Sequence, residues 1–255
     1  MYLSSRAFFL ISSVLLQIAS VTASKCVSKT TDFTKSHNGW KEISDAKKGV
    51  DFTAEGLKLT LYPPEKYVPA KNASQDGLPY NKYTSPYAPN FQFENLIQYG
   101  RVSFELKTAG APGVVTAAIL MSPGGDEIDF EMLGGDPKKV QTNYFYGKNI
   151  VYGVNGGNHD SEDTTSGFHT YTIDWSPTEI KYLIDNKEIR KVRKADTCKR
   201  ATCEYPTEAS AIQIGIWDAS NPSDTAEWAK GPVDWKKYKS ISAIIKSVKI
   251  ECGSN

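Results

Sequence analysis

Residues 126–133 read DEIDFEML, a stretch in which acidic and apolar side chains alternate. Successive side chains of a β-strand point to opposite faces, so this period of two predicts a strand that buries Ile128, Phe130 and Met132. The opposite face then carries three carboxylates that repel one another, and folding alone gives no reason for them. The stretch therefore predicts a sheet with one buried face and a chemical site on the other.

The same period of two recurs along the rest of the chain. Apolar and polar residues alternate over 57–61, 101–107, 180–184 and 212–216. Turn-forming Pro, Gly and Asn clusters separate these runs, and the sequence shows no sustained apolar repeat of 3.6 residues. The pattern predicts an all-β fold, a two-sheet antiparallel sandwich or jelly roll. The segment 63–95, rich in Pro, Tyr and Asn, is predicted to be a long irregular loop.

Composition excludes several classes of partner. The chain has 255 residues, and its 30 Lys and Arg balance 29 Asp and Glu to give a net charge of +1. A net charge so close to zero gives no overall electrostatic attraction to nucleic acid or to an anionic membrane, so neither is expected as a partner. The 14 Tyr, 10 Phe and 5 Trp include rings that could stack on sugars, although most are expected to pack in the core.

The first 23 residues are predicted to be a secretory signal peptide. Arg6 precedes a short apolar run, and small residues ending at Ala23 occupy the −3 and −1 positions of a cleavage site. The run is too short and too interrupted for a stable membrane span; an uncleaved anchor is the alternative. Residues 24–255 are expected to form one secreted domain, with no membrane span and no lipid-anchor tail.

Because the chain is predicted to be secreted, its four cysteines are expected to form disulfide bonds. Cys198 and Cys203 are close in sequence, which suits a local bridge, and Cys26 and Cys252 then pair by elimination near the ends of the mature chain. Scattered histidines and the lack of a Cys-x-x-Cys motif argue against a metal site, and no cofactor is expected. Asn72 begins the one usable glycosylation sequon.

The three carboxylates fit retaining glycoside cleavage. That reaction needs a nucleophile and a proton donor about 5–5.5 Å apart. Glu127 and Glu131 are about 13 Å apart along a strand, and long side chains that lean inward close much of this gap. Asp129 between them can hydrogen-bond the nucleophile and keep the donor protonated. A solvated acidic strip and a calcium site are the alternatives.

The run 126–135 resembles the Glu-x-Asp-x-Glu signature of glycoside hydrolase family 16, and the similarity extends over roughly residues 55–250. The resemblance implies a β-jelly-roll with a concave sugar-binding cleft. It also implies that Glu127 is the nucleophile, Asp129 the assisting carboxylate and Glu131 the general acid/base.

Two branches of that family share these features: plant xyloglucan transglycosylases and fungal Crh-type cell-wall transglycosylases. The stretches 134–145, 212–218 and 226–235 resemble the fungal branch. This resemblance implies an enzyme of the fungal cell wall that transfers chitin chains onto β-glucan, and we expect the enzyme to be a monomer. Many Crh-type proteins carry a chitin-binding module, a stalk or a lipid anchor, and the sequence shows none of them.

The alternation of side chains along the neighbouring strands predicts which of them face the cleft. The alternative is that these polar side chains form an outer face of the protein. Gly215 is expected to leave room for a sugar ring beside Trp217. By resemblance, Trp228, predicted to lie in a loop, lines the donor side next to Glu227. Trp175 and Trp235 are interpreted as packing residues. The predicted substrate-binding residues are Gln141, Asn143, Phe145, Gln213, Trp217, Glu227 and Trp228.

Three functions are compatible with these features. The first is a Crh-type transglycosylase. The second is a plain secreted β-glucan or chitin hydrolase, which differs only in that water rather than a sugar attacks the glycosyl-enzyme. The third is a non-catalytic sugar-binding jelly roll. The intact set of Glu127, Asp129 and Glu131 argues against the third, because a lectin needs no proton donor beside a nucleophile.

Overall fold

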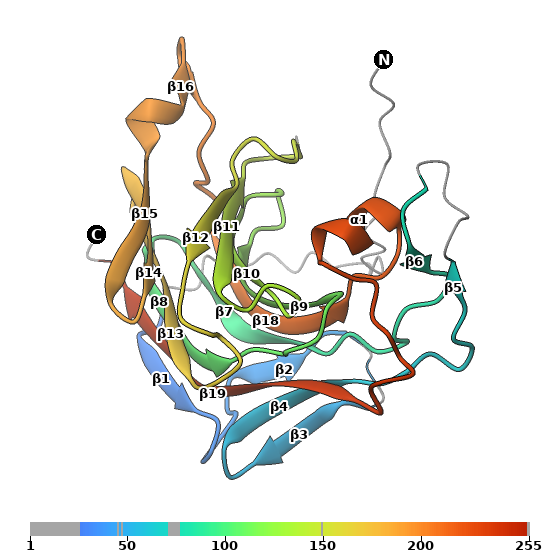
Figure 1. Cartoon of the computed structure of the whole chain (residues 1–255). Coiled ribbons are helices and arrows are strands. Elements are labelled where there is room, and N and C mark those ends of the chain that lie inside the picture. Colours follow the sequence, from blue (N-terminus) through green and yellow to red (C-terminus); the bar gives the residue numbers. More distant parts are fainter. Residues whose placement is uncertain (1–25, 45, 47, 71–76, 149, 254–255) are drawn as a thin grey trace.

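The computed structural model describes residues 26–253 except 45, 47, 71–76 and 149. The predicted signal peptide and Asn72 lie outside the described residues. Within the described part, two large β-sheets pack face to face, and all of their strand pairs are antiparallel (Figure 1). The prediction of an all-β, two-sheet jelly-roll sandwich is confirmed.

We call the sheet that contains the acidic strand the site sheet and the other one the outer sheet. The site sheet has the order β12 (Gly157–Asp160), β11 (Lys139–Phe145), β10 (Glu127–Leu133), β9 (Val114–Met121), β18 (Ser210–Asp218), β7 (Asn90–Ile97) and β2 (Trp40–Glu42). The outer sheet has the order β15 (Lys187–Arg193), β14 (Glu179–Ile184), β13 (His169–Trp175), β8 (Gly100–Lys107), β19 (Ile241–Cys252), β4 (Gly56–Leu61) and β3 (Val50–Thr53). Strand β1 (Lys29–Asp32) also pairs with β19.

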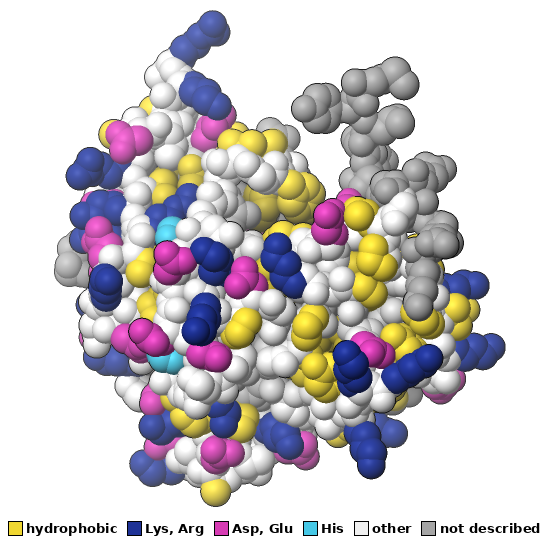
Figure 2. All heavy atoms as spheres, in the orientation of Figure 1, with side chains coloured by type: hydrophobic (Ala, Val, Ile, Leu, Met, Phe, Trp, Pro, Cys, Tyr) yellow, Lys and Arg dark blue, Asp and Glu magenta, His cyan; other side chains and the backbone are white. Residues whose placement is uncertain are grey.

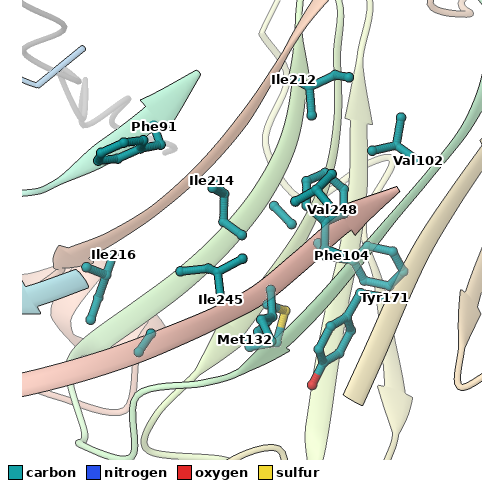
Figure 3. Close-up of a cluster of buried hydrophobic side chains, with 14 of the residues drawn as sticks. Phe91, Val102, Phe104, Met132, Tyr171, Ile212, Ile214, Ile216, Ile245 and Val248 are labelled. Atoms are coloured by element: carbon teal, nitrogen blue, oxygen red, sulfur yellow. The ribbon is translucent and has the colours of Figure 1, made fainter. Parts of the chain in front are cut away.

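The core lies between the two sheets, where their apolar faces meet. Ile128, Phe130 and Met132 of β10 are at most 1% exposed, as the alternation predicts. Figure 3 shows side chains of both sheets in one cluster, including Met132, Phe104 and Tyr171. Because this face of the site sheet is occupied by the core, its polar side chains are directed to the opposite face.

Two sequence predictions about local structure are wrong. The segment 63–95 is not loop throughout, because its last residues begin strand β7, where Phe91 and Phe93 are buried. The alternation of buried residues at this point is short and follows a Pro-rich stretch, so the sequence alone did not indicate a strand. Trp228 ends a helix, α1 (Ser223–Trp228), instead of lying in a loop. A helix of six residues is too short to show a 3.6-residue repeat.

The remaining elements are short. They are the hairpin of β5 (Pro69–Ala70) and β6 (Tyr80–Asn81), the 3-10 helix η1 (Lys194–Thr197), and the hairpin of β16 (Cys198–Lys199) and β17 (Thr202–Cys203). Disulfides join Cys26 to Cys252 and Cys198 to Cys203, the two pairings expected from the sequence. Among the described residues, no helix combines the length and apolar character required to cross a membrane.

Candidate active site

Strand β10 places its three carboxylates on the face of the site sheet that points away from the core, which we call the site face. Asp129 is only 2% exposed, and the two glutamates are partly exposed. Strand β11 runs antiparallel to β10 and contributes the side chains directly opposite. The cross-strand pairs are Glu127–Phe145, Asp129–Asn143 and Glu131–Gln141. The structure therefore brings the three β11 residues predicted from parity to the three carboxylates.

The burial and mutual repulsion of the three carboxyl groups raise their pKa values. Burial raises the pKa of Glu127 to about 7. Burial, followed by the charge of Glu127, raises the pKa of Glu131 to about 8. Burial, followed by the charges of Glu131 and Glu127, raises the pKa of Asp129 well above its ordinary value. Both glutamates therefore keep their protons to higher pH than free carboxyl groups do, so one of the pair can carry a proton at neutral pH while the other is ionised.

Arg190, on the outer sheet, supports the site from the core side, and it was not predicted from the sequence. Arg190 of β15 donates from Nη1 to the carbonyl oxygen and to Oγ1 of Thr142, at 2.9 Å each. Its guanidinium lies 5.4 Å from the ring centroid of Tyr182. The Tyr182 hydroxyl donates to the carbonyl oxygen of Asn143 at 2.6 Å. The positive charge of Arg190 also counteracts the rise in the pKa of Asp129.

Two indoles meet at the Glu131 end of β10. The Nε1–H of Trp228 donates to Oε1 of Gln141 at 2.9 Å. The rings of Trp228 and Trp217 are stacked, with centroids 6.0 Å apart and planes inclined by 23°. Both rings pack against Val115 and other buried residues of this end of the sheet. The structure thus brings together three of the predicted substrate-binding residues, from β11, β18 and α1.

A row of amides extends the site face on the side of β18 and β7. Gln213 donates from Nε2 to Oε1 of Gln92 at 3.0 Å, and accepts from Nδ2 of Asn90 at 3.4 Å. Asn90 also lies over Gly215, where an added Cβ would be 3.3 Å from the carboxamide. The Asn90 side chain therefore occupies the space beside Gly215 that was expected to hold a sugar ring. Asn90 and Gln92 were missed because they belong to the segment predicted to be loop.

The other predicted residues have different surroundings. Phe145 is only 8% exposed, and its ring meets that of Tyr152 edge-on at 5.8 Å. Glu227 is exposed on α1 next to Trp228. Trp175 is buried, and its Nε1–H donates to the Pro206 carbonyl oxygen, as expected of a packing residue. Among the described residues, no group of three His, Cys, Asp or Glu side chains is arranged to hold a metal ion.

Comparisons with known proteins agree with this arrangement. The model of glycosyl hydrolases family 16 matches residues 38–237. Crh-like protein 4 of Aspergillus fumigatus is 40% identical over 152 residues, which cover 58% of this chain and 33% of that protein. Crh-like protein UTR2 of Candida albicans is 38% identical over 160 residues, which cover 59% of this chain and 34% of that protein. The chain thus spans about a third of the length of these curated relatives.

Solved structures share the fold over most of the chain. The structure described as Crh5 transglycosylase in complex with NAG superposes with a TM-score of 0.74 at 28% identity. The superposition covers 90% of this chain and 85% of that chain. The shared fold therefore extends over most of the chain, well beyond the share matched by the curated relatives.

Proposed function

Because this chain belongs to glycosyl hydrolases family 16, we propose that it is a retaining endo-transglycosylase that remodels the polysaccharides of a fungal cell wall. The observation that carries the proposal is the set of three carboxylates on one face of β10, where burial raises the pKa values of both Glu127 and Glu131. The Crh-like relatives and the Crh5 structural neighbour support the transfer reaction.

The proposed mechanism assigns one role to each carboxylate. Ionised Glu127 attacks the anomeric carbon while protonated Glu131 donates its proton to the departing glycosidic oxygen. The product is a glycosyl ester on Glu127. Glu131, now ionised, removes a proton from an incoming sugar hydroxyl, whose oxygen displaces Glu127 and restores the original configuration. Asp129, between the two, is assigned to orienting Glu127 by a hydrogen bond, while burial and the charge of Glu127 keep the donor Glu131 protonated.

The proposed donor is chitin and the proposed acceptor is β-glucan. The similar Crh5 complex contains NAG, the repeating unit of chitin. Trp228 and Gln141 are assigned to the donor side, because a partly exposed indole is a surface of the kind on which sugar rings stack. The amides of Asn143 and Gln213 suit sugar hydroxyls, and Glu227, which precedes Trp228 in α1, is assigned to the donor side with it.

We propose that the enzyme acts outside the cell, as a monomer. Two disulfides are typical of proteins from oxidising compartments, and the N-terminal sequence has the features of a signal peptide. Asn72, within its sequon, is then a glycosylation site.

One assay tests the proposal. The mature protein is incubated with chitin oligomers and fluorescent β-glucan oligosaccharides, and labelled polymer is measured against new reducing ends. The expected result is labelled polymer, which is absent with Glu127→Gln. New reducing ends without labelled polymer would identify a plain hydrolase. Sugar binding without either product would identify a non-catalytic sugar-binding protein.

A further inference from the structure

The loop between β11 and β12, described at residues 146–148 and 150–156, exposes an unusual group of apolar side chains. Its described residues include Ile150, Val151, Tyr152 and Val154, which are 55%, 49%, 59% and 64% exposed. Single exposed apolar residues are ordinary on a protein surface, but four within five positions form a patch that needs an explanation. Figure 2 shows hydrophobic side chains in the upper middle of the view, to the right of the β16 hairpin, where Figure 1 draws the chain between β11 and β12.

The N-terminal end of the β11–β12 loop is held beside the catalytic strand β10. Asp126, the residue before Glu127, is 4% exposed and accepts a 2.7 Å hydrogen bond from the backbone N–H of Gly147. The same carboxylate accepts from the N–H groups of Thr207 and Glu208 at 2.6 and 2.8 Å. The start of the loop is therefore tied to the residue that begins the acidic stretch.

The second end of the loop is fixed from the outer sheet. Arg190 donates from Nη2 to the carbonyl oxygen of Asn155 at 2.7 Å, while its Nη1 holds Thr142 of β11. Gly157, directly after the loop, pairs with Thr142 in the site sheet. One guanidinium thus connects the end of the loop to the strand beside the carboxylates. With both ends held, the apolar residues between them have a defined position relative to β10.

That position is next to Glu127. Phe145 lies directly opposite Glu127 in the sheet, and the Tyr152 ring meets Phe145 edge-on at 5.8 Å and 77°. Partial burial, followed by the charges of Glu127 and Glu131, raises the pKa of the Tyr152 phenol. Trp228 contacts Gln141, opposite Glu131. The carboxylates thus lie between aromatic groups at both ends of β10.

We propose that residues 150–154 of the β11–β12 loop cover the glycosyl ester on Glu127, with Tyr152 against the acceptor sugar, and thereby favour attack by a sugar hydroxyl over attack by water. This inference rests on the proposed transglycosylase function. In the favoured step, the acceptor oxygen bonds to the anomeric carbon, the bond to Glu127 breaks, and the acceptor proton passes to Glu131. A water molecule would react in the same way to give a free reducing end.

The physical reason is the difference between the two attacking molecules. A sugar ring has an apolar face of C–H groups that packs against an aromatic ring and the aliphatic side chains around it. Water makes no such contact, and an apolar surface beside the ester reduces its local access. The loop therefore stabilises the acceptor complex selectively, and its removal should lower the ratio of transfer to hydrolysis.

The test compares the ratio of transfer product to new reducing ends in the wild type and in loop variants at fixed acceptor concentration. Tyr152→Ala is expected to lower this ratio about two- to tenfold, the range of one ring contact. Tyr152→Phe keeps the ring and should keep the ratio near that of the wild type. Phe52→Ala, at an exposed aromatic residue on edge strand β3 of the outer sheet, is the matched control and should leave the ratio unchanged.

The outcomes separate this inference from the proposed function. A wild-type protein that makes no transfer product contradicts the function itself. If the wild type transfers and Tyr152→Ala keeps or raises the ratio, the inference about the loop is wrong. An equal drop in Tyr152→Phe and Tyr152→Ala would also overturn it, because the hydroxyl rather than the ring would then be responsible. Val154→Ser provides a second variant, with a smaller drop in the ratio expected.

Discussion

The indole Nε1–H of Trp228 donates a 2.9 Å hydrogen bond to Oε1 of Gln141, and this bond ties helix α1 to strand β11. The same indole stacks on Trp217 of β18. Strands β11 and β18 are separated in the sheet by β10 and β9. The Trp228 side chain therefore connects elements on both sides of the acidic strand, at the Glu131 end.

Substitution of Trp228 tests its assignment to the donor side. Trp228→Ala should weaken donor binding about two- to tenfold, because ring stacking contributes about 0.5–1.5 kcal/mol beyond burial. The ratio of transfer to hydrolysis should change little. Trp228→Phe keeps a ring but loses the hydrogen bond to Gln141, so it should have an intermediate effect. The measurement is the donor KM with chitin oligomers; unchanged donor kinetics combined with conversion to a hydrolase would place Trp228 on the acceptor side.

The roles of the two glutamates are tested by chemical rescue. Glu131→Ala removes the proton donor, so activity on ordinary substrates should be lost, while a donor with a good leaving group still forms the ester on Glu127. Azide can attack that ester without a base, and the product should be a β-configured glycosyl azide. NMR of the product gives its configuration. An α-configured azide would show inversion and rule out the double displacement.

The raised pKa of Glu131 also predicts a pH-dependent cost to stability. Its ordinary value is 4.5 and its value in the fold is about 8, so between these pH values the folded chain holds a proton that the unfolded chain releases. Stability contributed by this group is present below 4.5 and is lost as the pH rises toward 8, by at most about 1.4 kcal/mol per pH unit.

Glu131→Gln should therefore stabilise the fold, and more at pH 8.5 than at pH 5. The amide has the shape of the carboxyl group but releases no proton, so the variant lacks this slope. Urea unfolding of both proteins at the two pH values measures the difference. An equal gain at both values would show that Glu131 keeps its ordinary pKa in the fold. Glu105→Gln, at a glutamate on the outer sheet whose carboxylate bonds Lys246, is the control and should show no such gain at high pH.

The acidic strand could be predicted from sequence because its signal is local. A period of two fixes which side chains share a face, and the pairs Glu127–Phe145, Asp129–Asn143 and Glu131–Gln141 follow once two such strands are neighbours. The same logic placed Gln213 and Trp217 on the face opposite the isoleucines of β18, where the structure has them. For these strands, parity alone was sufficient to predict the orientation of the side chains.

The other parts of the site depend on which segments become neighbours, and no local pattern contains that information. Gln92 reaches Gln213 because β7 pairs with β18, more than a hundred residues later in the chain. Tyr152 reaches Phe145 through the path of a loop. Arg190 faces the core beside Tyr182 because β15 pairs with β14. One signal in the sequence could have indicated this position of Arg190. Arg190 lies two residues before the apolar Val192, so the two side chains share one face of the strand.

A pair of buried tyrosines offers a last test, of the core behind the site. Tyr171 and Tyr182 both meet the ring of Phe130 edge-on, at 5.6 and 5.4 Å, and both are fully buried. The Tyr182 hydroxyl donates to the carbonyl oxygen of Asn143 at 2.6 Å. The Tyr171 hydroxyl has no hydrogen-bond partner among the described residues. The two positions therefore differ chiefly in whether a buried polar group is satisfied.

Removal of each hydroxyl should change stability in opposite directions. Tyr171→Phe takes away an unpaired buried hydroxyl, so it should raise the free energy of unfolding by about 1 kcal/mol. Tyr182→Phe breaks a hydrogen bond that links β14 of the outer sheet to β11 of the site sheet, and should lower it by about 1 kcal/mol. Urea unfolding of the two variants beside the wild type gives both values. A loss of stability in Tyr171→Phe would show that its hydroxyl is paired in solution, and the contrast between the two positions would then be wrong.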